Sequence, residues 1–200
     1  MTNYLGIEVL EISPNARDPR EDGLDRSVSA LDPGLGTRSV RGRSEAPAIS
    51  TPVVWTCPDR AAIASMEAFL DAHRGRAVPF WLPSRRRDLM LAQAVGASDS
   101  SILIQSAGYA RHMFPAQARR HLAFLNGATW IYRSVLAAAE GGGVETLTLN
   151  APLGVALPGG ALISHLLLCR LASDEIEITY ITESVAEVTL PCSELPQEVP

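Results

Sequence analysis

The stretch "AFLDAHRGRAVPFWLPSRRRDLMLAQ", residues 68–93, contains the features on which the expected fold depends. An amphipathic pattern ends at Gly75, the apolar segment 79–83 follows, and three consecutive arginines come next. Glycine commonly stands just beyond the last residue of a helix. The stretch therefore predicts a helix, then a short strand over residues 78–82, and then a charged turn.

The helix is expected to pack one apolar stripe against a sheet. Pro58 suits the first helical position, and Asp59 would lie near the positive end of the helix dipole. Apolar residues then recur at helical spacing, while the charged residues lie elsewhere on the helix. Trp55 on the preceding strand and Phe80 on the following strand complete this core. The predicted core under the helix consists of Ile63, Met66, Phe69, Leu70, Phe80 and Trp55.

Outside this helix, the patterns predict a mainly β fold of the α+β class. Residues 5–12 and 52–57 are expected to form strands, and short alternating runs follow one another from residue 100 onward. Glycine-rich and proline-rich turns separate these runs. Segment 13–50 contains few large apolar residues, so it predicts an irregular arm with at most a short hairpin around residues 37–43.

The overall composition excludes several classes of protein. The net charge of −5 gives no field that would draw the molecule to nucleic acid or to anionic lipid. No apolar run approaches the roughly 20 residues of a membrane span, and the N-terminal residues lack the pattern of a signal peptide. All seventeen basic residues are arginine, which excludes a Walker-type phosphate loop. We expect a globular protein that folds in a cytoplasm.

No group of residues has the spacing of a catalytic or metal site. Cys57, Cys169 and Cys192 are far apart and form no C-x-x-C motif, so we expect structural thiols. His165 and Cys169 lie in an apolar strand pattern, which favours core packing over zinc ligation. The sequence also lacks G-x-S-x-G and glycine-rich phosphate motifs. We therefore expect no enzyme activity, no metal and no cofactor.

The apolar strand and the arginine turn form the main candidate contact surface. Adjacent strand residues point to opposite faces, so an inward Phe80 leaves Trp81 pointing outward; a second buried layer is the alternative. The arginines can pair with carboxylates of a neighbouring copy, and a solvated turn is the alternative. The candidate interface residues are Trp81, Pro83, Arg85, Arg86, Arg87 and Asp88. The candidate contacts for a glycan or a partner protein are Tyr109, Trp130 and Tyr132.

The segment "CPDRAAIASMEAFLDAHRGRAVPFWLPSRRRD", residues 57–88, resembles the minor tail protein M of lambda-like phages and the wider distal tail protein group. Residues 174–198 resemble the strand pair that closes the same domain, so the resemblance covers roughly half the chain. The sequence departs from the short members of the family by its irregular segment 13–50 and by the block 96–166. The matching positions are Ala68, Phe69, Leu70, His73, Gly75, Phe80, Trp81 and Pro83.

The resemblance implies a β-sheet belt domain with one packed helix, formed by residues 1–95 and 167–200, with the irregular arm at 13–50. It implies a small β-barrel or sandwich domain inserted at 96–166. The implied protein is a structural virion component that forms a ring at the distal end of a long flexible phage tail, between the tail tube and the tail tip or baseplate hub.

The resemblance also implies the partners. They are further copies of the chain in a homohexameric ring, the tail tube protein, the tail tip hub proteins and a receptor-binding protein. We expect no membrane partner and no sequence-specific nucleic acid, and a location in the virion tail tip after assembly in the host cytoplasm. The alternative function is a baseplate binding module whose inserted β domain binds a host-surface glycan or a receptor-binding protein.

Overall fold

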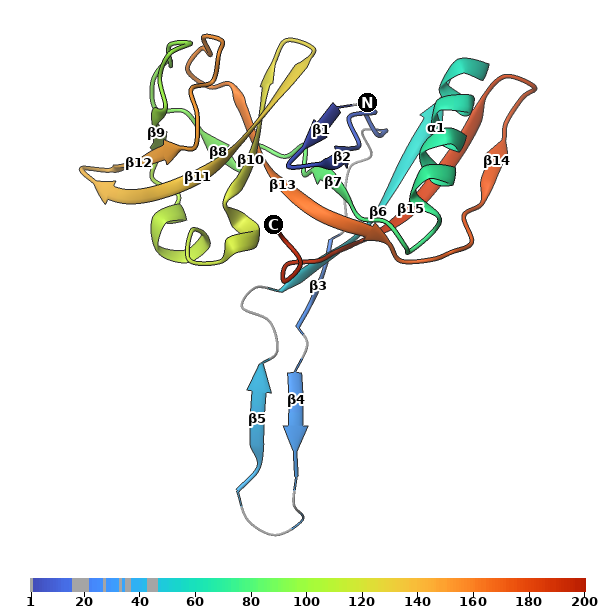
Figure 1. The fold of residues 1–200 in the computed structure, drawn as a ribbon, viewed down its shortest axis with the longest axis horizontal. Helices are drawn as coiled ribbons and strands as arrows, with labels where there is room; N and C mark the ends of the chain where they lie inside the picture. Colours follow the sequence, from blue (N-terminus) through green and yellow to red (C-terminus); the bar gives the residue numbers. More distant parts are fainter. Residues whose placement is uncertain (1, 16–21, 27, 33, 35–36, 43–46) are drawn as a thin grey trace. The chain divides into compact units, whose positions relative to one another are not determined.

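The computed structural model describes residues 2–15, 22–26, 28–32, 34, 37–42 and 47–200. The fold is mainly β with one α-helix among these residues, as predicted (Figure 1). The chain divides into two compact units. The first comprises residues 1–11, 81–167 and Val199, and the second comprises residues 12–80, 168–198 and Pro200.

This division differs in part from the predicted domains. The predicted boundary after residue 166 lies one residue from the observed boundary after residue 167. Residues 1–11 and 81–95, however, belong with the block that we expected to be a separate insertion. The reason is that the N-terminal strands pair with the chain around Trp81: the Leu10 amide donates to the Trp81 carbonyl at 2.9 Å, and Val9 is in parallel register with Trp81.

The first unit is built mainly from antiparallel strands. The strand order β9, β12, β11, β10, β13 is continuous, and each neighbouring pair is antiparallel. A π-helical turn at Tyr109–Met113 and a 3-10 turn at Gln117–Arg119 connect β9 to β10. The strands are β1 (Thr2–Tyr4), β2 (Ile7–Val9), β7 (Phe80–Pro83), β8 (Leu89–Met90), β9 (Ser101–Gln105), β10 (His121–Asn126), β11 (Thr129–Gly141), β12 (Val144–Leu149) and β13 (Leu162–Leu171); β7 begins, and β13 ends, in the second unit.

The predicted single strand over residues 5–12 is wrong. Leu5 and Gly6 form a tight turn with φ angles of 52° and 78°, and β1 and β2 pair as an antiparallel hairpin across it. Two consecutive positive φ angles match the two-residue turns whose twist suits a hairpin. The alternating pattern hides this turn because Leu5 continues the apolar period.

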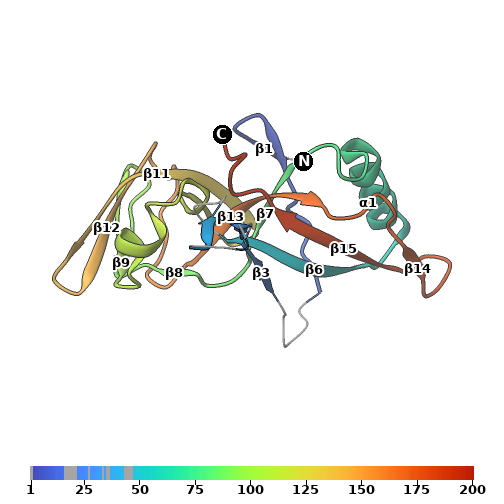
Figure 2. The same cartoon turned by 90° about the horizontal axis from the view of Figure 1, so that it is seen from below.

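The second unit is a sheet with one helix beside it (Figures 1 and 2). The long strands β6 (Ala48–Cys57) and β15 (Ala186–Glu194) pair antiparallel. Strand β3 (Gly23–Asp25) adds to β6, and β14 (Ile178–Tyr180) adds to β15. Trp55 on β6 is fully buried, and its indole N–H donates to the Ile12 carbonyl at 3.0 Å.

Helix α1 (Arg60–His73) begins two residues later than the Pro58 start that we predicted. Asp59 is the N-cap: its backbone is extended, and its carboxylate accepts from the Ala62 amide at 2.8 Å. Such a bond satisfies one of the unpaired amides of the first turn. At the other end, Arg74 and Gly75 both have positive φ, so Gly75 lies just beyond the helix as expected.

The predicted core under the helix is confirmed, except that Leu70 is only half-buried. His73 joins this core in the last turn. Its ring lies between Phe69 and Phe80, with centroid distances of 4.1 and 5.2 Å, and its Nδ1 lies 2.8 Å from the Phe69 carbonyl oxygen. The fully or nearly fully buried members are Trp55, Ile63, Met66, Phe69, His73 and Phe80.

The arm is more regular than predicted. Strands β4 (Val28–Leu31) and β5 (Ser39–Gly42) form an antiparallel hairpin, and only β5 falls in the expected hairpin 37–43. Residues 16–21, 27, 33, 35–36 and 43–46 of the predicted arm lie outside the described residues. The composition argument missed β4 because this strand has only four residues, and Val28 and Leu31 are its only large apolar side chains.

Candidate functional site

Trp81 does not point to solvent, so the prediction of an outward anchor is wrong for this residue. Its side chain is fully buried, and its indole N–H donates to the Tyr4 carbonyl at 3.0 Å. Within the first unit its ring contacts Tyr4 at 5.5 Å and His121 at 5.0 Å between centroids. Every residue of β7 is buried, including Pro83. The strand therefore has no solvent-facing side. This is the arrangement that the sequence analysis gave as the alternative, in which Trp81 belongs to a second buried layer.

The arginine turn divides into an inward and an outward part. Arg85 donates to the Glu11 carbonyl, and its guanidinium lies 5.2 Å from the centre of the Trp130 ring. Asp88 is held inside as well, because its carboxylate accepts from the Ser84 hydroxyl and from the His165 amide. Arg85 and Asp88 therefore have partners in their own chain, which contradicts their assignment as partner contacts.

Arg86 and Arg87 are the outward part of this turn. Both are exposed, and Arg86 Nε lies 3.5 Å from Asp88 Oδ1. Within the described part of the chain, Arg87 makes no hydrogen bond or ion pair. These two guanidinium groups are the members of the predicted interface that solvent, or a second molecule, can reach.

The predicted aromatic platform for a glycan is not present as expected. Tyr109 is fully buried, and its hydroxyl donates to the Arg119 carbonyl at 2.9 Å. Tyr132 is also buried, and its hydroxyl donates to a carboxylate oxygen of Glu11 at 2.6 Å. Only Trp130 is partly exposed. Two of the three rings are therefore unavailable to a ligand, because Tyr109 on the π-helical turn and Tyr132 on β11 are both buried within the first unit.

Two buried histidines give this unit an electrostatic property that the spacing of the residues did not indicate. Burial lowers the pKa of His121 to about 4, and the neighbouring Arg120 adds to the shift. The Tyr4 hydroxyl lies 3.1 Å from His121 Nδ1. Burial also lowers the pKa of His165 well below its ordinary value, although Asp88 opposes the shift. Both rings are neutral at neutral pH and serve as packed core side chains.

We expect the His121→Gln variant to show a weaker dependence of stability on pH than the parent protein. In the unfolded chain a histidine is protonated near pH 6.5, whereas folded His121 stays neutral down to about pH 4. The unfolded state therefore binds more protons between these values, and the free energy of unfolding falls as the pH drops.

Between pH 7 and pH 5, the titration of His121 should lower the free energy of unfolding of the parent protein by roughly 2 kcal/mol. Urea unfolding at pH 7, 6 and 5 measures this loss, and His112→Gln, at an exposed position, is the control. Equal pH slopes in the parent and the His121→Gln variant would contradict the neutral, buried ring.

Glu145 is an important residue that sequence reasoning missed. Its side chain is fully buried, and its carboxylate accepts from the amides of Ala107, Tyr109 and Ala110 at 2.6, 3.2 and 2.6 Å. Burial opposes the ionised form, but these backbone bonds outweigh it and lower the pKa of Glu145 below its ordinary value. The carboxylate holds the π-helical turn in place, and no local pattern shows that β12 brings it there.

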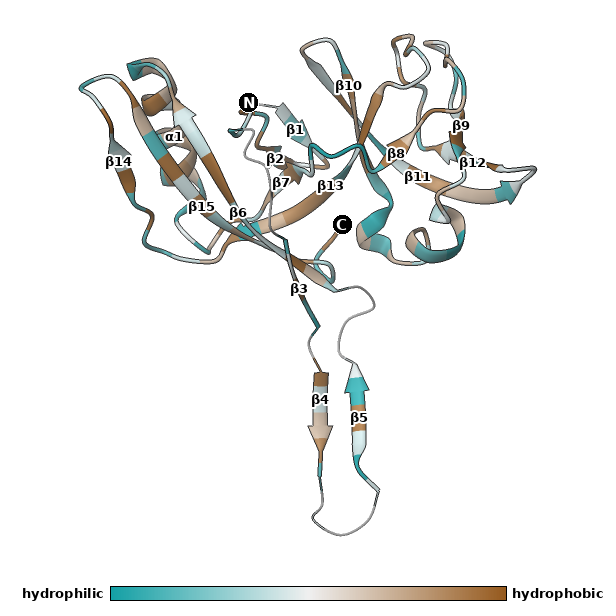
Figure 3. Cartoon of the chain, turned by 180° about the vertical axis from the view of Figure 1, so that it is seen from behind, coloured by the Kyte–Doolittle hydropathy of each residue, from teal (hydrophilic) through white to brown (hydrophobic). Residues whose placement is uncertain are grey.

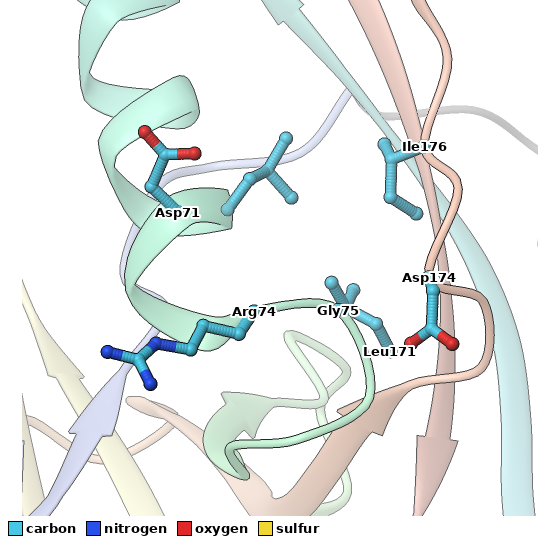
Figure 4. Close-up of a pocket in the computed structure, with 7 residues that line it drawn as sticks. Asp71, Arg74, Gly75, Leu171, Asp174 and Ile176 are labelled. Atoms are coloured by element: carbon cyan, nitrogen blue, oxygen red, sulfur yellow. The ribbon is translucent and has the colours of Figure 1, made fainter.

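An open pocket of about 450 Å³ lies at the end of α1 (Figure 4). Asp71 and Arg74 line it at the end of the helix, with the Arg74 guanidinium directed away from it, and Asp174 and Ile176 line it from the segment after β13. A salt bridge between Arg76 and Asp174, 2.6 Å long, stands next to it. The lining residues include no histidine, cysteine or serine, so the pocket offers a mixture of charged and apolar side chains and not a nucleophile with its base.

The position of Gly75 beside this pocket has a steric reason. Its φ is 63°, and a Cβ atom there would lie 2.6 Å from Oδ1 of Asp174. The same carboxylate accepts from the Arg76 amide at 2.9 Å. Hydrogen bonding by Arg76 lowers the pKa of Asp174. Gly75 therefore allows the close approach that ties the helix end to the start of the acidic segment.

The described residues contain no group of three or more His, Cys, Asp or Glu side chains arranged to hold a metal ion. None of the helices found among them is long and apolar enough to cross a membrane. No disulfide joins Cys57, Cys169 and Cys192, which are all buried. Neither a family model nor a curated protein matches this sequence.

Proposed function

We propose that this chain is a structural tail protein of a long flexible-tailed bacteriophage. It would form a ring at the distal end of the tail tube and join the tube to the tail tip or baseplate hub. The observation that carries the proposal is the hairpin of β4 and β5. None of its described residues is buried, yet it presents apolar side chains to solvent. An isolated two-stranded hairpin is marginally stable in water, so it is expected to be covered by another chain.

The residues of the family resemblance support a structural role. Phe69, His73 and Phe80 form one aromatic cluster that fastens the helix to the sheet. Gly75 allows the tight passage at the helix end. These positions serve packing and turn geometry rather than substrate chemistry, which agrees with a family that works by assembly.

A ring requires heterologous contacts, in which one surface of each copy fits a different surface of the next. Arg86 and Arg87 offer planar, always-charged groups for such a contact. Because Trp81 and Arg85 are engaged within the chain, the proposed interface at this turn is narrower than the residue pattern suggested.

We expect Arg86→Gln with Arg87→Gln to weaken ring assembly without changing the melting temperature appreciably. Exposed charges rarely change stability by more than about 0.5 kcal/mol. The matched control is Arg60→Gln with Arg111→Gln, which removes the same charge from exposed positions elsewhere. Light scattering after size-exclusion chromatography measures the assembly. A double variant that assembles as well as the control would remove this turn from the interface.

The test of the function itself is the oligomeric state of the purified chain. Native mass spectrometry and negative-stain images should show a closed homo-oligomeric ring, alone or with tail tube and hub proteins added. A chain that stays monomeric at micromolar concentration with these partners present would overturn the proposal.

A further inference from the structure

We propose that the β4–β5 hairpin of one copy pairs along strand β14 of the next copy, and that this contact closes the ring. The inference rests on the proposed ring-forming function and names the surfaces that meet. Both surfaces belong to the second unit of the chain.

One face of the hairpin is apolar, and its side chains are exposed among the described residues. In the observed register Ala30 stands opposite Val40, and Val28 stands opposite Gly42. Side chains two apart on a strand share a face, so these four residues lie on one side of the hairpin. Val28 and Val40 are each more than half exposed. Figure 3 shows hydrophobic colour on both strands.

Strand β14 lies at the edge of its sheet among the described strands. Among the described strands it pairs only with β15, through the register of Thr179 with Glu187. The opposite edge of β14 therefore has backbone N–H and C=O groups available to another strand, which is the usual route by which chains associate through sheets. Tyr180 and the adjacent Ile181 are both more than half exposed, so the edge offers apolar contact as well.

The charges of the two surfaces are complementary. Residues 34–42 of the arm contain Arg38 and Arg41 and no acidic residue. Residues 174–187, around β14, contain five acidic residues and no basic one. Glu175 and Glu177 are exposed next to the strand. Opposite potentials steer two surfaces together and disfavour wrong partners, so the basic strand of the arm fits this acidic edge better than it fits a second arm.

Such a contact is heterologous, because arm and edge are different surfaces of the same chain. Repeating one heterologous contact by rotation produces a ring when the rotation closes. Each copy would give one arm and accept one arm, so no hairpin and no β14 edge would stay uncovered in the closed assembly.

A charge swap tests this pairing. The arm variant is Arg38→Glu with Arg41→Glu, and the edge variant is Glu175→Arg with Glu177→Arg. Each double variant alone should raise the concentration needed for assembly at least tenfold. The quadruple variant, which combines all four substitutions, should assemble at the parent concentration again. An equimolar mixture of the two double variants should do the same. The substituted positions are exposed, so the far-ultraviolet circular dichroism and the melting temperature serve as folding controls.

Cross-linking locates the contact directly. The three native cysteines are buried, so Val40→Cys with Tyr180→Cys adds the only exposed thiols among the described residues. A short bismaleimide should convert this variant into a ladder of covalent oligomers up to ring size. Neither single-cysteine variant should give oligomers beyond a dimer. A link within one chain, seen as a monomer of altered mobility, would overturn the proposal.

The outcomes separate the two proposals. If the parent chain forms rings and both charge-reversal variants also form them, the arm contact is wrong and the ring function stands. If only the arm variant fails to assemble, the arm binds another surface and β14 is not its partner. If the parent chain is monomeric with tail partners present, the ring function fails, and the arm contact fails with it.

Discussion

The Trp81→Ala variant should lose about 3–5 kcal/mol of its free energy of unfolding, which is the usual cost of removing a buried aromatic side chain. Trp81 is fully buried, and its ring packs against Tyr4 and His121. The substitution would leave a cavity and would also leave the Tyr4 carbonyl without its indole donor, which adds to the loss. Urea unfolding followed by circular dichroism measures the change.

Trp130→Ala is the matched control for Trp81→Ala. Trp130 is only partly buried and lies beneath the guanidinium of Arg85, so its removal should cost about 1 kcal/mol, mainly the cation–π contact and some area. If Trp81→Ala instead kept its stability and lost assembly, Trp81 would be an interface anchor, and the burial of β7 described above would be incorrect.

Phe69→Ala should be similarly destabilising, by about 3–5 kcal/mol. Phe69 has no exposed surface, and its ring meets Phe80 edge-on at 5.2 Å. Alanine favours the helix itself, so a loss of stability would come from the packing of α1 on the sheet and not from helix formation.

Leu70→Ala, one position along the same helix, is the control for Phe69→Ala. Leu70 is half-buried. The Leu70→Ala variant should therefore lose clearly less free energy of unfolding than the Phe69→Ala variant. Thermal and urea unfolding of both variants decide the point. Equal, small effects at the two positions would show that the helix does not dock through the stripe of Ile63, Met66 and Phe69.

The spacing of apolar residues along the chain was sufficient to predict most of the secondary structure. The apolar stripe of α1 repeats every three or four residues, and that period exists only on a helix that buries one face. The strands after residue 100 are likewise confirmed, because a period of two together with glycine turns leaves few other conformations. The hairpin turn at Leu5 and Gly6 was not predicted, because positive backbone φ angles, and not side-chain polarity, create it.

The candidate site could be predicted only in part. The arginine turn was found because charge density is visible in the residues, and Arg86 and Arg87 are exposed as expected. The inward positions of Arg85, Tyr109 and Tyr132 depend on acceptors supplied by other segments. Glu145 was missed for the same reason, since the amides that it binds lie 35 to 38 residues away.

The order of residues alone dictates that Phe80 and Trp81 lie on opposite faces of an extended strand, because successive side chains alternate. It does not dictate how many faces of that strand are covered. Tyr4, 77 residues away along the chain, supplies the acceptor and part of the wall that enclose Trp81. Burial of a side chain depends on which distant segments fold against it, and only the tertiary structure brings those segments together.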